Sequence, residues 1–247
     1  TYASTQESTL RGNGVLFRGL LEVLAGRLII GGIVDTLGSE TSVEVAAGAA
    51  LTITGNGETF GSLAGGGTLA LNAPTTVGVN NRSTVFSGNL INGASFTKTG
   101  RGTLTLTGTN TFTGLLTVAG GILQLGLGNT LRDTHTVQVD AGGRLVIDGD
   151  DETIGVLTGA GEIDLKRSLI VSANAPASSF SGRMLGAGGL TKGGSNTFTL
   201  SGVNEFAGPL TVQDGTLEIA GNANTLSNTH VVDLATTSAR LRIAGDG

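Results

Sequence analysis

Four carboxylates form the most concentrated group of chemically capable side chains in this sequence: Asp148, Asp150, Asp151 and Glu152. Closely spaced carboxylates can coordinate Ca²⁺, which takes about six to eight oxygen ligands. A similar stretch 94 residues earlier has other residues at three of the four places, and only the glutamate recurs, as Glu58. The pattern therefore favours a solvated turn over a metal site. The recurring pairs Glu58-Thr59 and Glu152-Thr153 are typical of turns in which a Glu or Thr side chain accepts hydrogen bonds from backbone N–H groups.

The other residues that suggest chemistry are two histidines and a carboxylate pair. His135 and His230 occupy matching places after Asn-Thr-Leu, and the chain has no third histidine and no cysteine. This favours surface or turn positions over metal ligands or general bases. Glu162 and Asp164 can share one face of a strand, as the acid pair of a glycosidase would. Thr68 and Ala70 replace them 94 residues earlier, and the chain has no Trp and one Tyr to stack on sugar rings. We therefore predict no catalytic, cofactor-binding or metal-binding residue, and no enzyme.

Composition excludes several classes of protein. The net charge of −5 argues against nucleic-acid binding, which needs a basic surface. The absence of cysteine excludes disulfides and thiolate metal sites, and it is compatible with export through an oxidising compartment. The most apolar stretch, residues 14–34, is interrupted by Arg18, Glu22 and Arg27, so we predict no membrane span.

The chain repeats itself, and this repetition predicts the elements that carry these residues. When residues 38–71 are laid over residues 132–165, 14 of the 34 positions are identical. A shorter motif, a small residue followed by alternating apolar residues, recurs within this long repeat at intervals of 18 to 22 residues, as in Gly102-Thr103-Leu104-Thr105-Leu106. Alternation indicates half-buried strands, and about 20 residues per unit is typical of one coil of a parallel β-helix. We predict an all-β solenoid of about 12 coils.

Phenylalanines recur in step with the repeats, which indicates a structural role. Phe17, Phe112 and Phe206 occupy equivalent places, as do Phe86 and Phe180. We expect them to plug the core or to stack on one another rather than to form a ligand platform. A polar residue in place of Leu104 or Leu145 would disrupt the same core.

An ordered motif runs through residues 96–126. The segment Phe96-Thr97-Lys98-Thr99-Gly100 is followed by Gly102-Thr103-Leu104-Thr105-Leu106, then Asn110, Phe112, Thr117-Val118 and Gly121-Ile122-Leu123. This motif resembles the passenger-associated transport repeat (the autotransporter-associated β-strand repeat) of bacterial autotransporters, the type V secretion family. Residues 190–221 are a second, looser copy. Lys98 and Lys192 match the family pattern, and we expect them to be exposed turn residues. We divide the chain into long repeats at approximately 1–95, 96–189 and 190–247, all within one β-helical segment.

The resemblance implies a right-handed parallel β-helix that is exported through an outer-membrane translocator barrel of the same precursor, to the cell surface or the medium. It also implies that the repeat assists secretion or folding. We expect a structural segment of an adhesin or aggregation factor that associates with itself or with host surfaces and does not bind nucleic acid. A toxin-type passenger that forms oligomers, a β-helical polysaccharide-degrading enzyme and a passive spacer remain as alternatives.

Overall fold

A computed structural model describes residues 1–12, 17–32, 35–126, 130–172, 178–221, 226 and 230–244. The chain forms two compact units, Thr1–Gln124 and Leu125–Gly247. In the described part of both units every regular element is a β-strand. None of these residues belongs to a helix long and apolar enough to span a membrane.

The first unit contains two parallel sheets. In one, the strands follow the order β10-β7-β4-β2-β3-β6-β9-β12-β14, with β1 paired to β2, and in the other the order is β5-β8-β11-β13. Neighbours in each sheet belong to successive coils, and their registers are parallel. The strands are β1 (Tyr2–Gly12), β2 (Leu20–Gly32), β3 (Ser42–Val45), β4 (Ala50–Ile53), β5 (Glu58–Phe60), β6 (Ser62–Gly65), β7 (Thr68–Leu71), β8 (Thr75–Val77), β9 (Thr84–Phe86), β10 (Asn89–Asn92), β11 (Phe96–Lys98), β12 (Thr103–Leu106), β13 (Leu116–Val118) and β14 (Gly121–Leu125).

The second unit contains three series of hydrogen-bonded strands, and these strands are again parallel. Their orders are β16-β19-β22, β15-β18-β21-β24-β26-β28 and β17-β20-β23-β25-β27. The strands are β15 (Thr136–Val139), β16 (Gly143–Ile147), β17 (Glu152–Ile154), β18 (Val156–Gly159), β19 (Glu162–Leu165), β20 (Leu169–Val171), β21 (Ser178–Phe180), β22 (Arg183–Leu185), β23 (Leu190–Lys192), β24 (Thr197–Leu200), β25 (Leu210–Val212), β26 (Thr216–Ala220), β27 (Val232–Leu234) and β28 (Arg240–Ala244).

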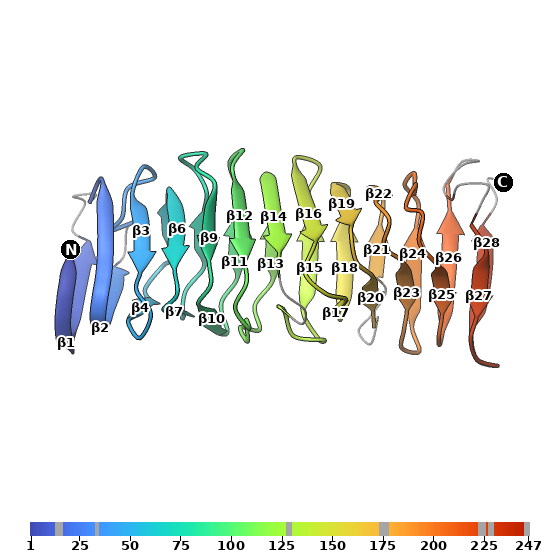
Figure 1. Cartoon of the computed structure of the whole chain (residues 1–247), viewed down its shortest axis with the longest axis horizontal. Coiled ribbons are helices and arrows are strands. Elements are labelled where there is room, and N and C mark those ends of the chain that lie inside the picture. Colours follow the sequence, from blue (N-terminus) through green and yellow to red (C-terminus); the bar gives the residue numbers. More distant parts are fainter. Residues whose placement is uncertain are drawn as a thin grey trace. The chain divides into compact units, whose positions relative to one another are not determined.

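Within each unit the strands wind into stacked coils, so that equivalent strands lie side by side (Figure 1). The predicted β-solenoid is confirmed, and the described residues form about 11 coils against the 12 expected for the chain. The difference arises because the coils vary in length and their turns contribute no periodic signal.

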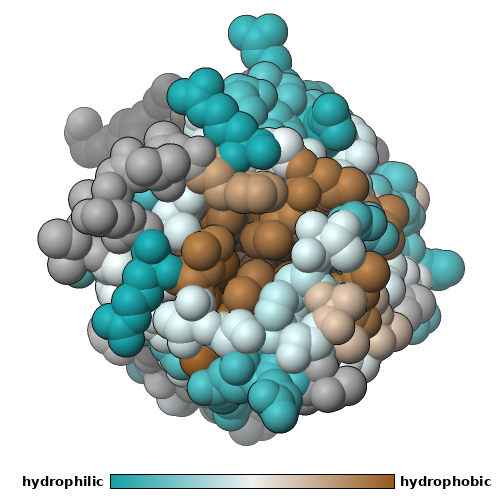
Figure 2. Space-filling model, turned by 90° about the vertical axis from the view of Figure 1, so that its left-hand side faces the viewer, coloured by the Kyte–Doolittle hydropathy of each residue, from teal (hydrophilic) through white to brown (hydrophobic). Residues whose placement is uncertain are grey.

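The core follows the alternation seen in the sequence. In β12 the side chains of Leu104 and Leu106 are 1% and 0% exposed, whereas Thr103 and Thr105 point outward. Viewed from the N-terminal end of the first unit, apolar residues occupy the centre and hydrophilic residues the rim (Figure 2). Burial of apolar surface between stacked coils therefore holds each unit together.

Most of the recurring phenylalanines lie in this core, as predicted. Phe86, Phe112, Phe180 and Phe206 are at most 1% exposed. Phe17 differs, with 36% of its surface exposed. It lies near the start of the first unit, outside the strands, where its backbone forms an isolated parallel bridge to Leu37.

Candidate functional site

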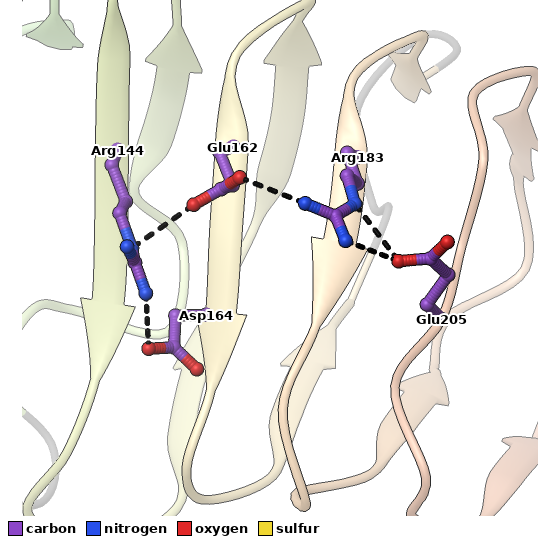
Figure 3. Close-up of polar contacts among 5 residues, drawn as sticks. All are labelled: Arg144, Glu162, Asp164, Arg183 and Glu205. Atoms are coloured by element: carbon purple, nitrogen blue, oxygen red, sulfur yellow. Dashed lines mark hydrogen bonds and ion pairs between the residues drawn. The ribbon is translucent and has the colours of Figure 1, made fainter.

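A row of alternating charges crosses the outer surface of the second unit (Figure 3). Arg144 of β16 lies in register with Glu162 of β19, which lies in register with Arg183 of β22. Arg144 Nε is 3.1 Å from Glu162 Oε1, and Arg183 Nη1 is 3.4 Å from Glu162 Oε2. Arg183 also donates hydrogen bonds to Glu205, whose carboxylate raises the pKa of the guanidinium above its ordinary value. The coil period thus places charges of opposite sign on successive coils.

The carboxylate pair considered for sugar hydrolysis is part of this row. Asp164 Oδ2 lies 2.7 Å from Arg144 Nη2, and its side chain is 10% exposed, so Arg144 is shared between Asp164 and Glu162. A general acid must release a proton to the substrate, and a general base must be within reach of one. Both carboxylates are instead bound by guanidinium groups. The arrangement therefore joins neighbouring coils through ion pairs and does not resemble a catalytic pair.

Threonines form a second outward row, in the first unit. Thr59, Thr76, Thr97 and Thr117 are the middle residues of β5, β8, β11 and β13, and each is in register with the next. All four are half-buried, between inward-facing neighbours. Strand spacing puts a hydroxyl and a methyl group at intervals of about 4.8 Å along this row. Such a surface is polar, uncharged and regular.

The carboxylates at residues 148–152 do not converge on one point. Asp148 pairs with Lys166 at 3.4 Å, and Asp151 accepts a hydrogen bond from the backbone N–H of Ser168. Asp150 is exposed, whereas Glu152 is fully buried, so the predicted solvated turn is wrong for the glutamate. Within the described ranges no three His, Cys, Asp or Glu side chains gather closely enough to hold a metal ion.

The histidines were expected at surface or turn positions, and neither side chain is fully exposed. His135 is 3% exposed, and the equivalent Thr41 in the first unit is fully buried. The side chain at this position therefore faces inward. His135 does close a turn, its backbone N–H donating to the carbonyl oxygen of Arg132, so the prediction of a surface or turn position is wrong only for the surface. His230 is half-buried, with its ring 4.4 Å from that of Phe206 in an edge-to-face contact.

Two glutamates inside the solenoid act on the preceding coil, as the sequence predicted for the Glu-Thr pairs. The Glu58 carboxylate accepts hydrogen bonds from the backbone N–H groups of Thr36 and Leu37, at 2.9 to 3.0 Å. Glu152 accepts from Thr130 and Leu131 in the same way, at 2.9 and 3.0 Å. Each carboxylate thus satisfies two donors of a turn, which would otherwise be buried without partners.

Burial dominates the acidity of both glutamates. It raises the pKa of Glu58 above its ordinary value, and it raises the pKa of Glu152 to about 7, although the backbone N–H donors act in the opposite direction. Desolvation disfavours the charged form of a carboxyl group.

The Glu152 shift predicts how stability depends on pH. The unfolded carboxyl group loses its proton near pH 4.5, whereas the folded one keeps it until about pH 7. Because the folded state binds this proton more tightly, the stability that Glu152 contributes is fully present below pH 4.5 and is lost as pH rises through 7. Urea denaturation at several pH values measures this, and Glu152→Gln should flatten the profile. Asp150→Asn, at an exposed neighbour, should leave it unchanged; an unaltered profile in Glu152→Gln would contradict the assignment.

The expected exposure of the two repeat lysines is wrong. Lys98 and Lys192 are 1% and 0% exposed, because each faces inward two residues after a buried Phe96 or Leu190. Lys98 Nζ donates to the carbonyl oxygens of Thr99, Gly100 and Gly120 at 2.6, 3.3 and 3.1 Å. Burial lowers the pKa of Lys98 to about 8 and lowers that of Lys192 as well.

Comparison with known proteins agrees with this architecture. Residues 96–125 and 190–219, which contain both buried lysines, match the passenger-associated-transport-repeat family. The adhesin BmaC autotransporter of Brucella suis biovar 1 (strain 1330) is 36% identical over 234 residues. The chain is an autotransporter passenger segment. No solved structure matched it significantly.

The passenger segment represents a small part of its curated relative. The alignment covers 78% of this chain and 6% of BmaC. Autotransporter passengers reach the cell surface or the medium through the outer membrane, and that is the location of this segment. Its buried glutamates and lysines and its outward rows are therefore parts of a surface-exposed solenoid.

Proposed function

We propose that this passenger segment is a non-enzymatic adhesive module and that its outward threonine row forms the contact surface. The observation that carries the proposal is the similarity to a passenger named an adhesin. The threonine row Thr59, Thr76, Thr97 and Thr117 supports it, because a regular polar surface can make many weak contacts at once. The translocator barrel of the same precursor would present this surface outside the cell.

The geometry favours adhesion over hydrolysis. The two carboxylates with the best spacing for sugar cleavage, Glu162 and Asp164, are held by Arg144. The threonine row carries no formal charge, so a partner surface can approach it without stripping water from an ion. The partner can be a host surface or a second copy of the passenger. Both would meet the same row of hydroxyl and methyl groups.

Retention of protein-coated beads tests the proposal. Beads carrying the 247-residue chain should be retained on cultured epithelial cells, and Thr76→Lys combined with Thr97→Lys should lower retention several-fold, because contact would then desolvate two ammonium groups. Thr113→Lys, at an exposed position outside the row, is the matched control. Sedimentation over a concentration series separates self-association from host contact.

Three results would argue against adhesion through this surface. If beads carrying the double variant Thr76→Lys and Thr97→Lys are retained as well as beads carrying Thr113→Lys, the threonine row is not part of the contact surface. Absence of retention together with a monomer at all concentrations would favour a passive spacer. Leakage from lipid vesicles would favour the toxin-type alternative.

A further inference from the structure

Three consecutive strands around each buried lysine are nearly alike. In the first unit, β8 reads Thr-Thr-Val, β11 Phe-Thr-Lys and β13 Leu-Thr-Val, and they stack in that order. Lys98 therefore stands in an inward column between Val77 and Val118. Lys192 likewise stands between Val171 and Val212 in the second unit. In both units the middle strand therefore has a lysine at the inward position where the two strands beside it have a valine.

The apolar pattern alone specifies the register of such strands incompletely. A slip by one residue turns every side chain to the opposite face and is strongly disfavoured. A slip by two residues keeps inward positions inward and still stacks apolar groups on apolar groups. Strands of three residues, as β8, β11 and β13 are, offer few contacts with which to tell these registers apart.

The lysine contacts distinguish the two registers. Lys98 Nζ reaches its own turn, at Thr99 and Gly100, and the turn of the next coil, at Gly120. Lys192 Nζ repeats the arrangement with Gly193, Gly194 and Asp214, at 2.6, 2.8 and 3.0 Å. A two-residue slip would move the next coil's carbonyl by about 7 Å, two strand rises, and would leave a buried ammonium without that acceptor.

Glycines in both turns keep these carbonyls in place. Gly100 and Gly121 have φ values of 67° and 61°, a region that favours glycine. A Cβ atom on Gly121 would lie 2.2 Å from the Gly100 carbonyl oxygen, so the two turns stack in direct contact. Gly194 and Gly215 have φ values of 69° and 67° in the second copy. The acceptors are thus built into the backbone of the repeat.

We propose that Lys98 and Lys192 select the stacking register of the coils in their repeats, each by binding the carbonyl oxygens of two successive turns with one buried ammonium group. The lysine is a positioning residue. The valines above and below it show that an apolar side chain fits this column. A buried cation is commonly no more stabilising than an apolar residue of similar size, and the best-attested use of such groups is to fix register.

Disulfide trapping in the cysteine-free chain tests the proposal. Thr97→Cys with Thr117→Cys reports the native register, in which these outward residues are partners. Thr97→Cys with Ala119→Cys reports the two-residue slip. Each pair is placed in the otherwise unchanged chain and in Lys98→Val, refolded from urea, and oxidised. We expect Lys98→Val to raise the yield of the slipped disulfide relative to the native one about tenfold, which corresponds to about 1.4 kcal/mol.

Two further variants separate the loss of the Lys98 ammonium donor from a change in side-chain bulk and from effects elsewhere in the chain. Lys98→Met keeps the bulk without the donors and should behave as Lys98→Val does; a native-register ratio in Lys98→Met would overturn the proposal. Lys192→Val, in the other unit, should leave both yields unchanged. An unaltered ratio in Lys98→Val would show that the strands need no lysine to align. If Lys98→Val gave low and equal yields of both disulfides, as an unfolded chain in urea would, Lys98 would be required for folding as such. That result would also contradict a role in register.

Discussion

Replacing Leu104 with asparagine should lower the free energy of unfolding by about 4 kcal/mol, the largest effect we expect from one side chain. Leu104 is 1% exposed and lies in β12 beside inward-facing Leu106. Loss of a buried leucine side chain costs about 2–5 kcal/mol, and burying an amide without partners adds about 1–3 kcal/mol. Urea denaturation followed by circular dichroism measures the change.

The neighbouring outward position provides the control. Thr105→Asn places the same side chain one residue away, on the solvent side of β12, and should change stability by less than about 0.5 kcal/mol. Similar losses in Leu104→Asn and Thr105→Asn would mean that the strand does not present alternate residues to a common core.

Substitution of Gly88 by alanine should destabilise the first unit by about 3 kcal/mol, at the upper end of overpacking effects. A Cβ atom at Gly88 would lie 1.7 Å from the carbonyl oxygen of Gly67 in the adjacent coil, and one at Gly108 would lie 2.0 Å from the oxygen of Gly88. The obstacle is backbone, so no side-chain rotation relieves it. The two coils would have to separate locally and lose ladder hydrogen bonds such as that from Asn89 N to Gly67 O.

A second glycine in the same unit tests whether crowding is the cause. A Cβ atom at Gly93 would meet only Thr113 Oγ1, at 3.7 Å, which is ordinary contact. Gly93→Ala should therefore leave the urea midpoint nearly unchanged. A midpoint for Gly88→Ala within error of the wild-type value would show that the coils stack less closely than described.

The sequence predicted the fold well, because the solenoid depends on a local signal. Alternation such as that in Thr103–Leu106 determines which side chains face inward. The interval at which this alternation recurs gives the length of one coil. The number of coils was overestimated by about one, since turns of variable length carry no apolar period. The pairing of Glu58 and Glu152 with backbone N–H groups followed from the recurrence of the Glu-Thr pairs.

The inward lysines were mispredicted although a signal was present. Lys98 lies two residues after Phe96 in a three-residue strand, so alternation alone places both on the inner face. The lysines were assigned to an exposed turn because lysine is usually exposed, and their place in the inward–outward alternation of the strand was not used. The same error affected His135, whose equivalent Thr41 is buried.

The charge row was only partly accessible to sequence reasoning. Arg144, Glu162 and Arg183 are separated by 18 and 21 residues, close to the coil period, so charges compared at that interval would have aligned. Glu205 is outside the strands, and its approach to Arg183 depends on the path of a turn. The functional assignment depended on a family resemblance, because the structural residues themselves specify no ligand.

Nitrogen-15 NMR of the lysine side chains tests most directly whether charged residues inside the solenoid bind its stacked turns. The chain has three lysines, so Lys98→Arg, Lys166→Arg and Lys192→Arg assign the signals, with Lys166 as the exposed comparison. We predict that Lys98 titrates near pH 8 and that its Nζ protons exchange slowly with water. Titration near 10.4, the value of a free lysine, with fast exchange would place Lys98 in an exposed turn and contradict the account.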